Sequence, residues 1–376
     1  MRHLDDESHF QYFRMSASKF DNLLHRIAPL ITHDRRHCSP VDASQRLAVT
    51  LRYLATGISQ QALAASYKLG RMTVCNIVQE VCEAIWTALE SEFVAFPSEA
   101  QWKTIAEDFW RLWDFPFCLG AIDGKHVRIR APEHSGSDYF NYKGYCSIIL
   151  MAACDARYRF TYVDVGAFVR ESDGGVFSRS TFGSQLINGE LPLPAPAVLP
   201  GSQTMSPYVF LGDEAFPLRM NLMRPYPGSN LSMDKKIYNY RQARARRVVE
   251  NGFGIMASRF RIFSRPIDCS PKKVVVIIKA CVALHNFLCQ TESTRYIPSG
   301  LVDTVTSAGE LQQGEWRQVV EGDTNLLSHG RLTMERATRL AVLVREQFKD
   351  YFLTESGMLP YQERIVQRGT LQSLSE

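Results

Sequence analysis

The chain has 376 residues and a mass of 42.7 kDa, with 45% apolar, 11% aromatic and 22% charged residues. At roughly 100–200 residues per domain this length excludes a single small domain and predicts two or three folded units. The composition excludes an intrinsically disordered chain, and no apolar run approaches the roughly 18 residues of a membrane span. The opening residues are acidic where a signal peptide is basic and then apolar, so we expect an intracellular, soluble protein.

The cysteines and the charge distribution further limit the class of protein to which the chain can belong. The nine cysteines include no CxxC pair, and several lie in apolar runs, which predicts reduced, buried thiols and argues against a cysteine zinc site. The net charge of +4 is unevenly distributed, because residues 214–265 hold eleven Lys/Arg and three acids. We expect this stretch to attract polyanions.

The first hundred or so residues predict helices. Apolar positions recur every three or four residues through 19–31, 44–57 and 72–93. Gly57 and Gly70 interrupt this pattern and separate the predicted helices.

Residues 59–89 have the dimensions of a helix-turn-helix, with a first helix, a short turn at 68–70 and a long second helix from about 73 to 89. In such a motif, outward-facing residues near the start of the second helix contact DNA. Here these residues are Arg71, Thr73, Asn76 and Gln79. The alternative is a helical hairpin that only packs.

From Phe115 the pattern changes to short β-type runs bounded by Gly, Asp or Pro. The predicted strands lie within 117–123, 126–132, 146–155, 159–168 and 208–213. The predicted helices that follow or separate them are 177–186, 240–257 and 272–289, with a surface loop over 190–207. This order predicts an α/β fold with a mixed sheet flanked by helices.

The chain is therefore expected to have three parts. A helical N-terminal region covers 1–110, and the α/β domain covers 111–290. A C-terminal extension, 291–376, carries a predicted helix at about 334–352, where apolar residues again recur at helical spacing.

Three acids stand out by their placement. Asp123 closes an apolar run before Gly124, Asp213 closes another, and Glu250 is the only acid across 235–267, on an arginine-rich helix. A carboxylate at the end of a buried strand is held rigidly, and a small neighbour leaves room for an ion or a phosphate. Phosphoryl transfer uses two divalent ions about 3.5–4 Å apart, and carboxylates supply the hard oxygens that Mg²⁺ prefers.

Each acid also has an ordinary structural interpretation. A strand-end aspartate before glycine is commonly a turn former, and Glu250 has Arg246 and Arg247 at ion-pairing distance along a helix. Placement alone does not select the catalytic acids, because three further aspartates lie in similar turns: Asp155, Asp164 and Asp173.

The arginines of the same helix, Arg241, Arg244, Arg246 and Arg247, have two interpretations. They contact phosphates of a nucleic acid, or they pair with Glu250 three or four residues on. The sequence leaves both open.

Three other polar residues are candidates for the chemistry. Lys143 lies in a Tyr- and Gly-rich loop and is a candidate for holding a phosphate. His126 and His285 lie in a strand-rich and an apolar helical context, so we expect buried, hydrogen-bonded histidines rather than general bases.

Six segments in one order resemble the Harbinger (PIF-like) DDE transposases and their domesticated nuclease relatives. The resemblance covers about residues 110–290 and rests on PFCLGAIDGKHVRIRAP (116–132), YFNYKGYCSIILMAACDARYRFTYVDVG (139–166), YVFLGDEAFPL (208–218), RPYP (224–227), YNYRQARARRVVENGFGIMASRFRIF (238–263) and ACVALHNFL (280–288).

The resemblance implies an RNase H-like catalytic core with a DDE carboxylate triad. The acids of the family's IDG, LGD and VVE motifs fall on Asp123, Asp213 and Glu250. It also implies a divalent metal cofactor, Mg²⁺ or Mn²⁺, with two ions per site. A metal-activated water then cleaves a DNA phosphodiester, and strand transfer follows in a full transposase.

Other residues of these motifs are given smaller roles. Asp155 and Asp173 are expected to be structural or to support the triad. Lys125 stands where many family members have a threonine-like residue, and we expect this difference to affect fine substrate contacts and to leave the metal site untouched.

By resemblance we also expect DNA as substrate, a Myb-like DNA-binding partner protein, a homodimer and a nuclear location shared with the cytoplasm. Two alternatives remain open. One is a domesticated DNA-binding or scaffold protein without cleavage activity. The other is a metal-dependent hydrolase of a small phosphoester, which the basic stretch does not favour.

Overall fold

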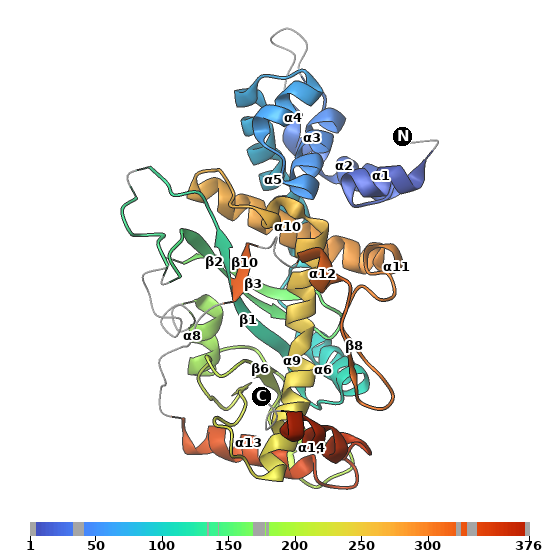
Figure 1. The fold of residues 1–376 in the computed structure, drawn as a ribbon, viewed down its shortest axis with the longest axis vertical. Helices are drawn as coiled ribbons and strands as arrows, with labels where there is room; N and C mark the ends of the chain where they lie inside the picture. Colours follow the sequence, from blue (N-terminus) through green and yellow to red (C-terminus); the bar gives the residue numbers. More distant parts are fainter. Residues whose placement is uncertain are drawn as a thin grey trace.

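The computed structural model describes residues 5–32, 41–133, 135–141, 143–167, 177, 180–320, 325–328 and 337–372. Figure 1 shows the N-terminal helices at one end, a central sheet beneath them and the C-terminal helices at the other end. The long helix α9 runs beside the sheet toward the C-terminal helices. Buried apolar side chains from all three regions form one continuous core.

The N-terminal region is helical, as predicted. Its helices are α1 (Asp6–Phe13), α2 (Ala17–Ile31), α3 (Ala43–Thr56), α4 (Gln60–Tyr67), α5 (Arg71–Phe93) and α6 (Glu99–Trp113). Side chains of Ser16, Asp42, Ser59 and Ser98 accept hydrogen bonds from the first turns of α2, α3, α4 and α6, which fixes where these helices start. The sequence pattern missed α1 and α6.

Helices α4 and α5 are joined by the three-residue turn Lys68–Gly70. Lys68 adopts a left-handed conformation (φ 53°) that ends α4, and Gly70 is the N-cap of α5. Three residues at the start of α5 are exposed: Arg71, Thr73 and Asn76. Gln79 is partly buried, and its side-chain amide donates to Glu83.

The central sheet is mixed, as predicted. Its strands are β1 (Cys118–Arg128), β2 (Ser147–Cys154), β3 (Phe160–Ala167), β6 (Val209–Leu211), β7 (Leu222–Met223) and β10 (Leu326–Ser328). The order is β3-β2-β1-β6-β7, with β10 also paired to β1. Strands β1, β2 and β3 are antiparallel neighbours, whereas β6 is parallel to β1 and β7 is parallel to β6.

One strand prediction was wrong in a way that matters for the site. Segments 117–123 and 126–132 were predicted as two strands, but β1 continues through Asp123 and Gly124 to Arg128. The cause is β2, which pairs with β1 without interruption from Ala121 to Arg128 and so holds Gly124 in the ladder. Asp123 therefore lies inside a strand and not at its end.

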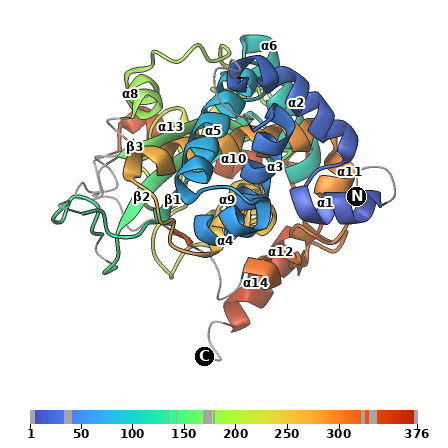
Figure 2. The same cartoon turned by 90° about the horizontal axis from the view of Figure 1, so that it is seen from above.

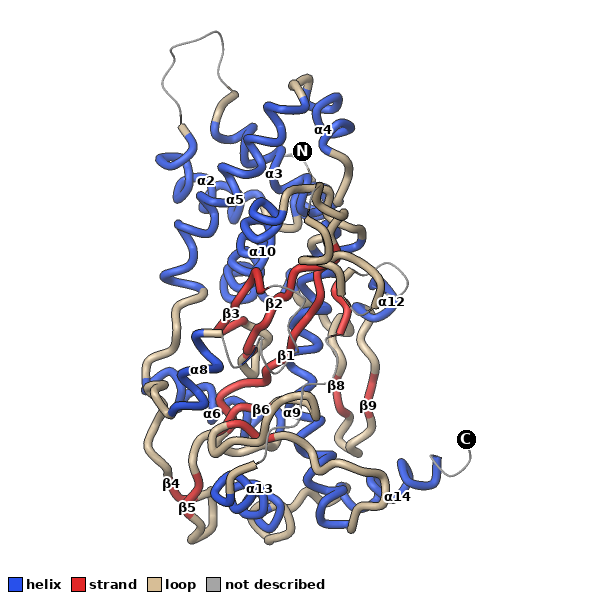
Figure 3. Tube along the Cα trace, turned by 90° about the vertical axis from the view of Figure 1, so that its left-hand side faces the viewer, coloured by secondary structure: helices blue, strands red, loops and turns tan. Residues whose placement is uncertain are grey.

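The edge of β1 opposite β2 is shared by two short strands. Residues 118–121 of β1 pair with β6, and residues 125–127 pair with β10. Asp123 lies between these two paired stretches. The C-terminal extension thus completes the central sheet with β10, which Figure 1 shows among the other strands. Figure 3 shows the sheet between the N-terminal helices and α13.

The remaining elements surround this sheet. They are β4 (Ala197–Val198), β5 (Met205–Ser206), α8 (Thr181–Asn188), α9 (Met233–Arg259), η1 (Arg261–Ser264), α10 (Pro271–Thr291), α11 (Ser293–Tyr296), β8 (Thr304–Val305), β9 (Leu311–Gln312), α12 (Trp316–Val320), α13 (Arg339–Tyr351) and α14 (Gln362–Gln372). The predicted loop 190–207 contains the β4–β5 hairpin. The predicted helix 334–352 is found as α13, and its residues 334–336 lie outside the described part of the chain.

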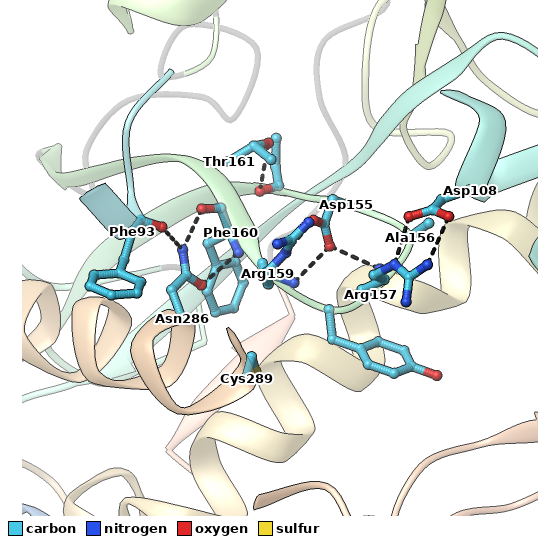
Figure 4. Close-up of polar contacts among 12 residues, drawn as sticks. Phe93, Asp108, Asp155, Ala156, Arg157, Arg159, Phe160, Thr161, Asn286 and Cys289 are labelled. Atoms are coloured by element: carbon cyan, nitrogen blue, oxygen red, sulfur yellow. Dashed lines mark hydrogen bonds and ion pairs between the residues drawn. The ribbon is translucent and has the colours of Figure 1, made fainter. Parts of the chain in front are cut away.

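Helix α10 connects the helical region to the sheet. It packs against α5 and β3, and Figure 2 shows α5 above it. The side chain of Asn286 accepts from Phe160 N and donates to the carbonyls of Phe93 and Phe160, which ties three elements together (Figure 4). Helix α10 is long and apolar enough to cross a membrane, but 72% of its apolar window is buried inside the fold.

The cysteines within the described residues are free thiols, as predicted. Six of them are buried: Cys82, Cys118, Cys146, Cys154, Cys281 and Cys289.

Candidate carboxylate site

Sheet register brings Asp123 and Asp213 together. Ala121 of β1 pairs with Leu211 of the parallel strand β6, so the two aspartates lie two residues beyond the same paired position. Gly212 precedes Asp213, and a Cβ at Gly212 would lie 2.8 Å from the Phe216 ring. The loop after β6 therefore folds tightly and turns Asp213 toward β1.

Helix α9 brings the third acid. The buried Gln242 donates from Nε2 to the carbonyl of Gly212 at 2.6 Å, which fixes α9 against the loop that carries Asp213. Two turns further along α9, Glu250 faces the same space. A cavity of about 370 Å³ is lined by Asp123, Asp213, Glu250, Lys125, Arg246, Phe253, Gly254, Ala257, Trp316, Arg317, Val320 and Leu326.

Two of the three acids of this cavity are paired with internal cations. Lys125 Nζ lies 2.7 Å from Asp123 Oδ2, and these side chains are only 12% and 9% exposed. Arg246 lies 2.7 Å from Glu250 Oε1, which supports the ion-pair interpretation of this arginine. The expectation that Lys125 leaves the carboxylate site untouched is wrong, because alternate residues of a strand project from the same face of a sheet.

Asp213 is in a different electrostatic state from the other two acids. Burial, and then the negative charge of Asp123, raise the pKa of Asp213 above its ordinary value. Its Oδ1 accepts from Ala215 N at 2.8 Å. Within the described ranges, the structure gives Asp213 no ion-pair partner within 4 Å.

The C-terminal extension forms one wall of the cavity. Trp316 of α12 donates to Asn251 at 2.9 Å and packs on Gly254, where a Cβ would lie 2.3 Å from the indole. Arg317 reaches toward Glu250 at 3.9 Å and is held by the fully buried Asp303. The sequence did not predict this wall, because its residues are more than 60 positions from the acids.

The residues present fit a hard divalent cation by chemistry. All three acids line one cavity, and the negative charges of Asp123 and Asp213 repel each other, which a cation between them would relieve. The described chain contains no group of three or more His, Cys, Asp or Glu already gathered at metal-binding geometry. In this conformation Lys125 and Arg246 neutralise part of the donor set.

Arg241 and Arg244 are not phosphate contacts, which corrects the prediction for both. Arg241 is fully buried and donates to the carbonyls of Asp114 and Gly357 and to Gln362 Oε1. Arg244 is 8% exposed and pairs with Asp114 at 2.7 Å. Both side chains point into the junction between α9, α6 and the C-terminal extension.

Arg247 is partly buried. Its Nε lies 4.0 Å from the buried Asp303 carboxylate, and burial lowers the pKa of its guanidinium. The arginines of α9 described above are thus buried or partly buried. The number of arginines in this part of the sequence therefore overstates the positive charge on the surface.

Lys143 lies on the surface, in the loop between β1 and β2. Its backbone N–H donates to Asn141 Oδ1 at 2.9 Å, while the residue itself is exposed. This exposure is compatible with the expected phosphate contact.

Both histidines are buried and hydrogen-bonded, as predicted. His126 Nδ1 lies 2.9 Å from Ser147 Oγ. His285 Nε2 lies 2.8 Å from the Tyr158 carbonyl, and its Nδ1 lies 3.1 Å from Tyr296 Oη. Neither lines the cavity of the three acids.

We expect His285 to make the protein sensitive to acid. Burial lowers the pKa of His285 from 6.5 to about 4, so the unfolded chain binds more protons than the native chain between these values. Stability from this residue is complete above pH 6.5 and decreases as the pH falls toward 4, by roughly 2 kcal/mol between pH 7 and pH 5. Urea unfolding at both pH values measures this loss. His285→Gln should unfold with a smaller difference between the two pH values, and an unchanged difference would contradict the prediction.

The other aspartates lie elsewhere. Asp155 Oδ1 accepts from the backbone N–H of Arg157 and Arg159, and its Oδ2 accepts from Arg159 Nε at 2.7 Å, so it organises the β2–β3 turn as expected of a structural residue. Asp164 is on β3 and partly buried, and burial raises its pKa. Asp173 lies outside the described residues.

A larger cavity, about 1210 Å³, lies between α6, the β2–β3 turn and the end of α10. Asp108 at its rim accepts two hydrogen bonds from Arg157 (Figure 4) and one from Arg111. The bonds from Arg157 are the main cause of a lowered pKa of Asp108. These charges satisfy one another and none of the three acids lines this cavity, so the carboxylate cavity is the better candidate site.

Comparison with known proteins defines the class. The sequence pattern of the family described as DDE superfamily endonuclease matches residues 122–286, a range that contains all three acids. Residues 122–286 therefore form a DDE superfamily endonuclease domain. No solved structure matches the chain.

Curated relatives match a longer part of the chain than this domain. The mouse (Mus musculus) protein named "Putative nuclease HARBI1" is 27% identical over 250 residues, which cover 65% of this chain and 67% of that protein. The Xenopus laevis protein of the same name is 25% identical, over 69% of this chain and 70% of its own length. Protein ALP1-like of Arabidopsis thaliana is 25% identical, over 77% and 72%. The chain is thus similar to Harbinger-derived DDE nucleases, which confirms the resemblance.

Proposed function

We propose that the protein is a divalent-metal-dependent DNA endonuclease whose carboxylate triad is Asp123, Asp213 and Glu250. The observation that carries this proposal is the single cavity shared by these three acids, within the matched domain. The strand order, with three antiparallel strands followed by two parallel ones, supports an RNase H-like core for this domain.

Each residue has a distinct part in this proposal. Asp123 and Asp213, held by neighbouring strands, bind the cation, Mg²⁺ or Mn²⁺. Glu250, on α9, completes the donor set. When bound, the metal supplies a water of lowered pKa and neutralises the developing charge of the phosphoryl group. Trp316 and Phe253 add apolar surface to the cavity lining, which lowers the local polarity and strengthens the electrostatic interactions beside it.

Glu250 must be released before it binds a cation. Arg246 holds it at 2.7 Å. Although burial opposes it, the negative charges of Glu250 and then of Asp123 and Asp213 raise the pKa of Arg246. On the arrival of a cation, Arg246 is free to turn its guanidinium to a phosphate oxygen, where a planar bidentate donor fits.

DNA binding is proposed to use two exposed regions. The start of α5 offers Arg71, Thr73 and Asn76, with Gln79 one turn further, in the arrangement expected of a recognition helix. Lys143 offers a cation from the β1–β2 loop. Arg241 and Arg244 take no part, because both are buried.

We expect Arg71→Ala and Lys143→Ala each to weaken DNA binding. Each lost phosphate contact removes roughly 0.9 from the slope of log K against log salt. Fluorescence anisotropy with a labelled duplex across a salt series measures both affinity and slope. Lys103→Ala is the matched control, because Lys103 is an exposed cation on α6 that pairs with Glu99. A flat salt response of the unaltered protein would contradict the proposed contacts.

Further features of the function are proposed by family resemblance alone. They are a Myb-like DNA-binding partner, a homodimer that handles two DNA ends, and a nuclear location shared with the cytoplasm. Co-purification of the tagged full chain from nuclei, with sizing by light scattering, tests all three.

The second candidate is a DNA-binding scaffold without cleavage activity. It is favoured by one observation, the internal neutralisation of Asp123 by Lys125 and of Glu250 by Arg246. Nicking of supercoiled plasmid with Mg²⁺, Mn²⁺ or chelator separates the two. Metal-dependent nicking supports the endonuclease, and salt-sensitive binding without nicking in either metal supports the scaffold.

A further inference from the structure

Lys125 is fixed in position inside the carboxylate cavity. Its backbone is in the sheet on both sides, opposite Leu150 of β2 and Ser328 of β10. Its side chain is 12% exposed, and Nζ lies 2.7 Å from Asp123 Oδ2 and 5.7 Å from the Phe253 ring centroid. An ammonium so enclosed belongs to the structure of the cavity and is not a mobile surface charge.

This ammonium takes up one of the two carboxylate oxygens of Asp123. Asp123 Oδ2 faces Lys125, and Oδ1 accepts from the backbone N–H of Gly124 at 2.9 Å. Of the three acids that line the cavity, Asp213 is the one that has no ion-pair partner within 4 Å among the described residues. The donors thus leave one cation position, next to Asp213.

The charge balance of the cavity points the same way. The cavity is lined by three carboxylates and by three cationic side chains, those of Lys125, Arg246 and Arg317. Arg317 is also held by Asp303, and its side chain is 34% exposed, while that of Arg246 is 22% exposed. Lys125 is the most enclosed of the three at 12%, and its backbone is paired on both edges of β1. The positive charge of two divalent ions and the Lys125 ammonium would far exceed the negative charge of the three carboxylates.

We propose that this protein holds one divalent cation, between Asp123, Asp213 and Glu250, and that the ammonium of Lys125 takes the position of the second. This inference rests on the proposed function. A lysine ammonium is a compact point charge with three donors, so it neutralises a phosphate oxygen as a second ion would. It differs from an ion in that it never dissociates from the protein.

Counting bound Mn²⁺ tests the inference. Isothermal titration of the full-length protein should give one Mn²⁺ per chain at the cavity, lost in Asp213→Asn. Lys125→Met keeps the apolar stem over Phe253 but removes the charge, and Lys125→Gln keeps a polar end. Both variants should bind two Mn²⁺, and their electron paramagnetic resonance spectra should show a spin-coupled pair at about 3.5–4 Å. The parent spectrum should show an isolated ion.

The matched control is Arg317→Gln, which removes a cation from the same cavity, on the wall that the C-terminal extension forms. It should remain at one Mn²⁺. Two ions in the parent, one ion in both Lys125 variants, or two ions in Arg317→Gln would each overturn the inference, the last because general charge relief would then explain the second ion. Circular dichroism of each variant verifies that it is folded.

Failure of the inference is separable from failure of the proposed function. If the parent binds two ions and nicks plasmid DNA, the endonuclease stands and the role of Lys125 falls. If the parent binds one ion, the Lys125 variants bind two and none of them nicks DNA, the role of Lys125 stands and the endonuclease falls. A parent that binds no Mn²⁺ overturns both.

Discussion

Asp213→Asn is expected to lose metal-dependent plasmid nicking by about 10³-fold or more, because a metal ligand contributes several kcal/mol of stabilisation to the developing charge and each 1.36 kcal/mol is a factor of ten. The same loss is expected for Asp123→Asn and Glu250→Gln, since all three acids line one cavity. Initial nicking rates in Mn²⁺ measure the effect.

The loss should occur without unfolding. Burial and the neighbouring Asp123 raise the pKa of Asp213, so the charged form of this residue costs stability at neutral pH. Asp213→Asn removes that cost and should unfold at the same or a higher temperature than the parent. Asp164→Asn, a partly buried acid on β3 outside the cavity, is the matched control and should keep its nicking rate. An inactive Asp164→Asn, or an active Asp213→Asn, would contradict the assignment.

Arg241→Met is expected to have the largest effect on stability, a loss of about 3 kcal/mol. The guanidinium donates to the carbonyls of Asp114 and Gly357 and to Gln362, and it stacks 4.3 Å from the Phe352 ring centroid. Methionine fills much of the volume but leaves these buried acceptors without donors, and each unsatisfied acceptor costs about 1–3 kcal/mol. The urea midpoint of the full-length protein measures the change.

The position of the damage gives a second readout. Because Arg241 fixes residues 357–362 to α9, limited proteolysis of Arg241→Met should cleave near this segment before any other part of the described chain. Arg265→Met is the control, because Arg265 is an exposed arginine. Its free energy of unfolding should stay within about 0.5 kcal/mol of that of the parent. Equal stability of the two variants would show that the buried contacts of Arg241 are not needed.

Local sequence patterns predicted the elements that the site needs. The helical spacing in 240–257 identified α9, and the apolar runs around 146–155 and 159–168 identified β2 and β3. The resemblance then selected three acids from six, and the structure lines one cavity with all three. Register explains why this works, since Ala121 and Leu211 pair two residues before Asp123 and Asp213.

The errors came from contacts that no local pattern encodes. Gly124 looks like the end of a strand, but the long partner β2 keeps it extended. Arg241 looks like a surface cation on a basic helix, but carbonyls more than 100 residues away surround it. The effect of Lys125 on Asp123 follows from alternation within a strand, and it would have been predicted if β1 had been recognised as continuous through both residues.

The pairing of β10 with β1 affects which fragments of the chain can be expected to stay in solution. The matched segment ends at residue 286, yet 326–328 cover the outer edge of β1 next to Asp123. A fragment trimmed to the matched segment would present an uncovered strand edge, a template on which β-sheets of separate molecules join and precipitate. Insolubility of such a fragment would therefore report a missing neighbour and say nothing against its chemistry.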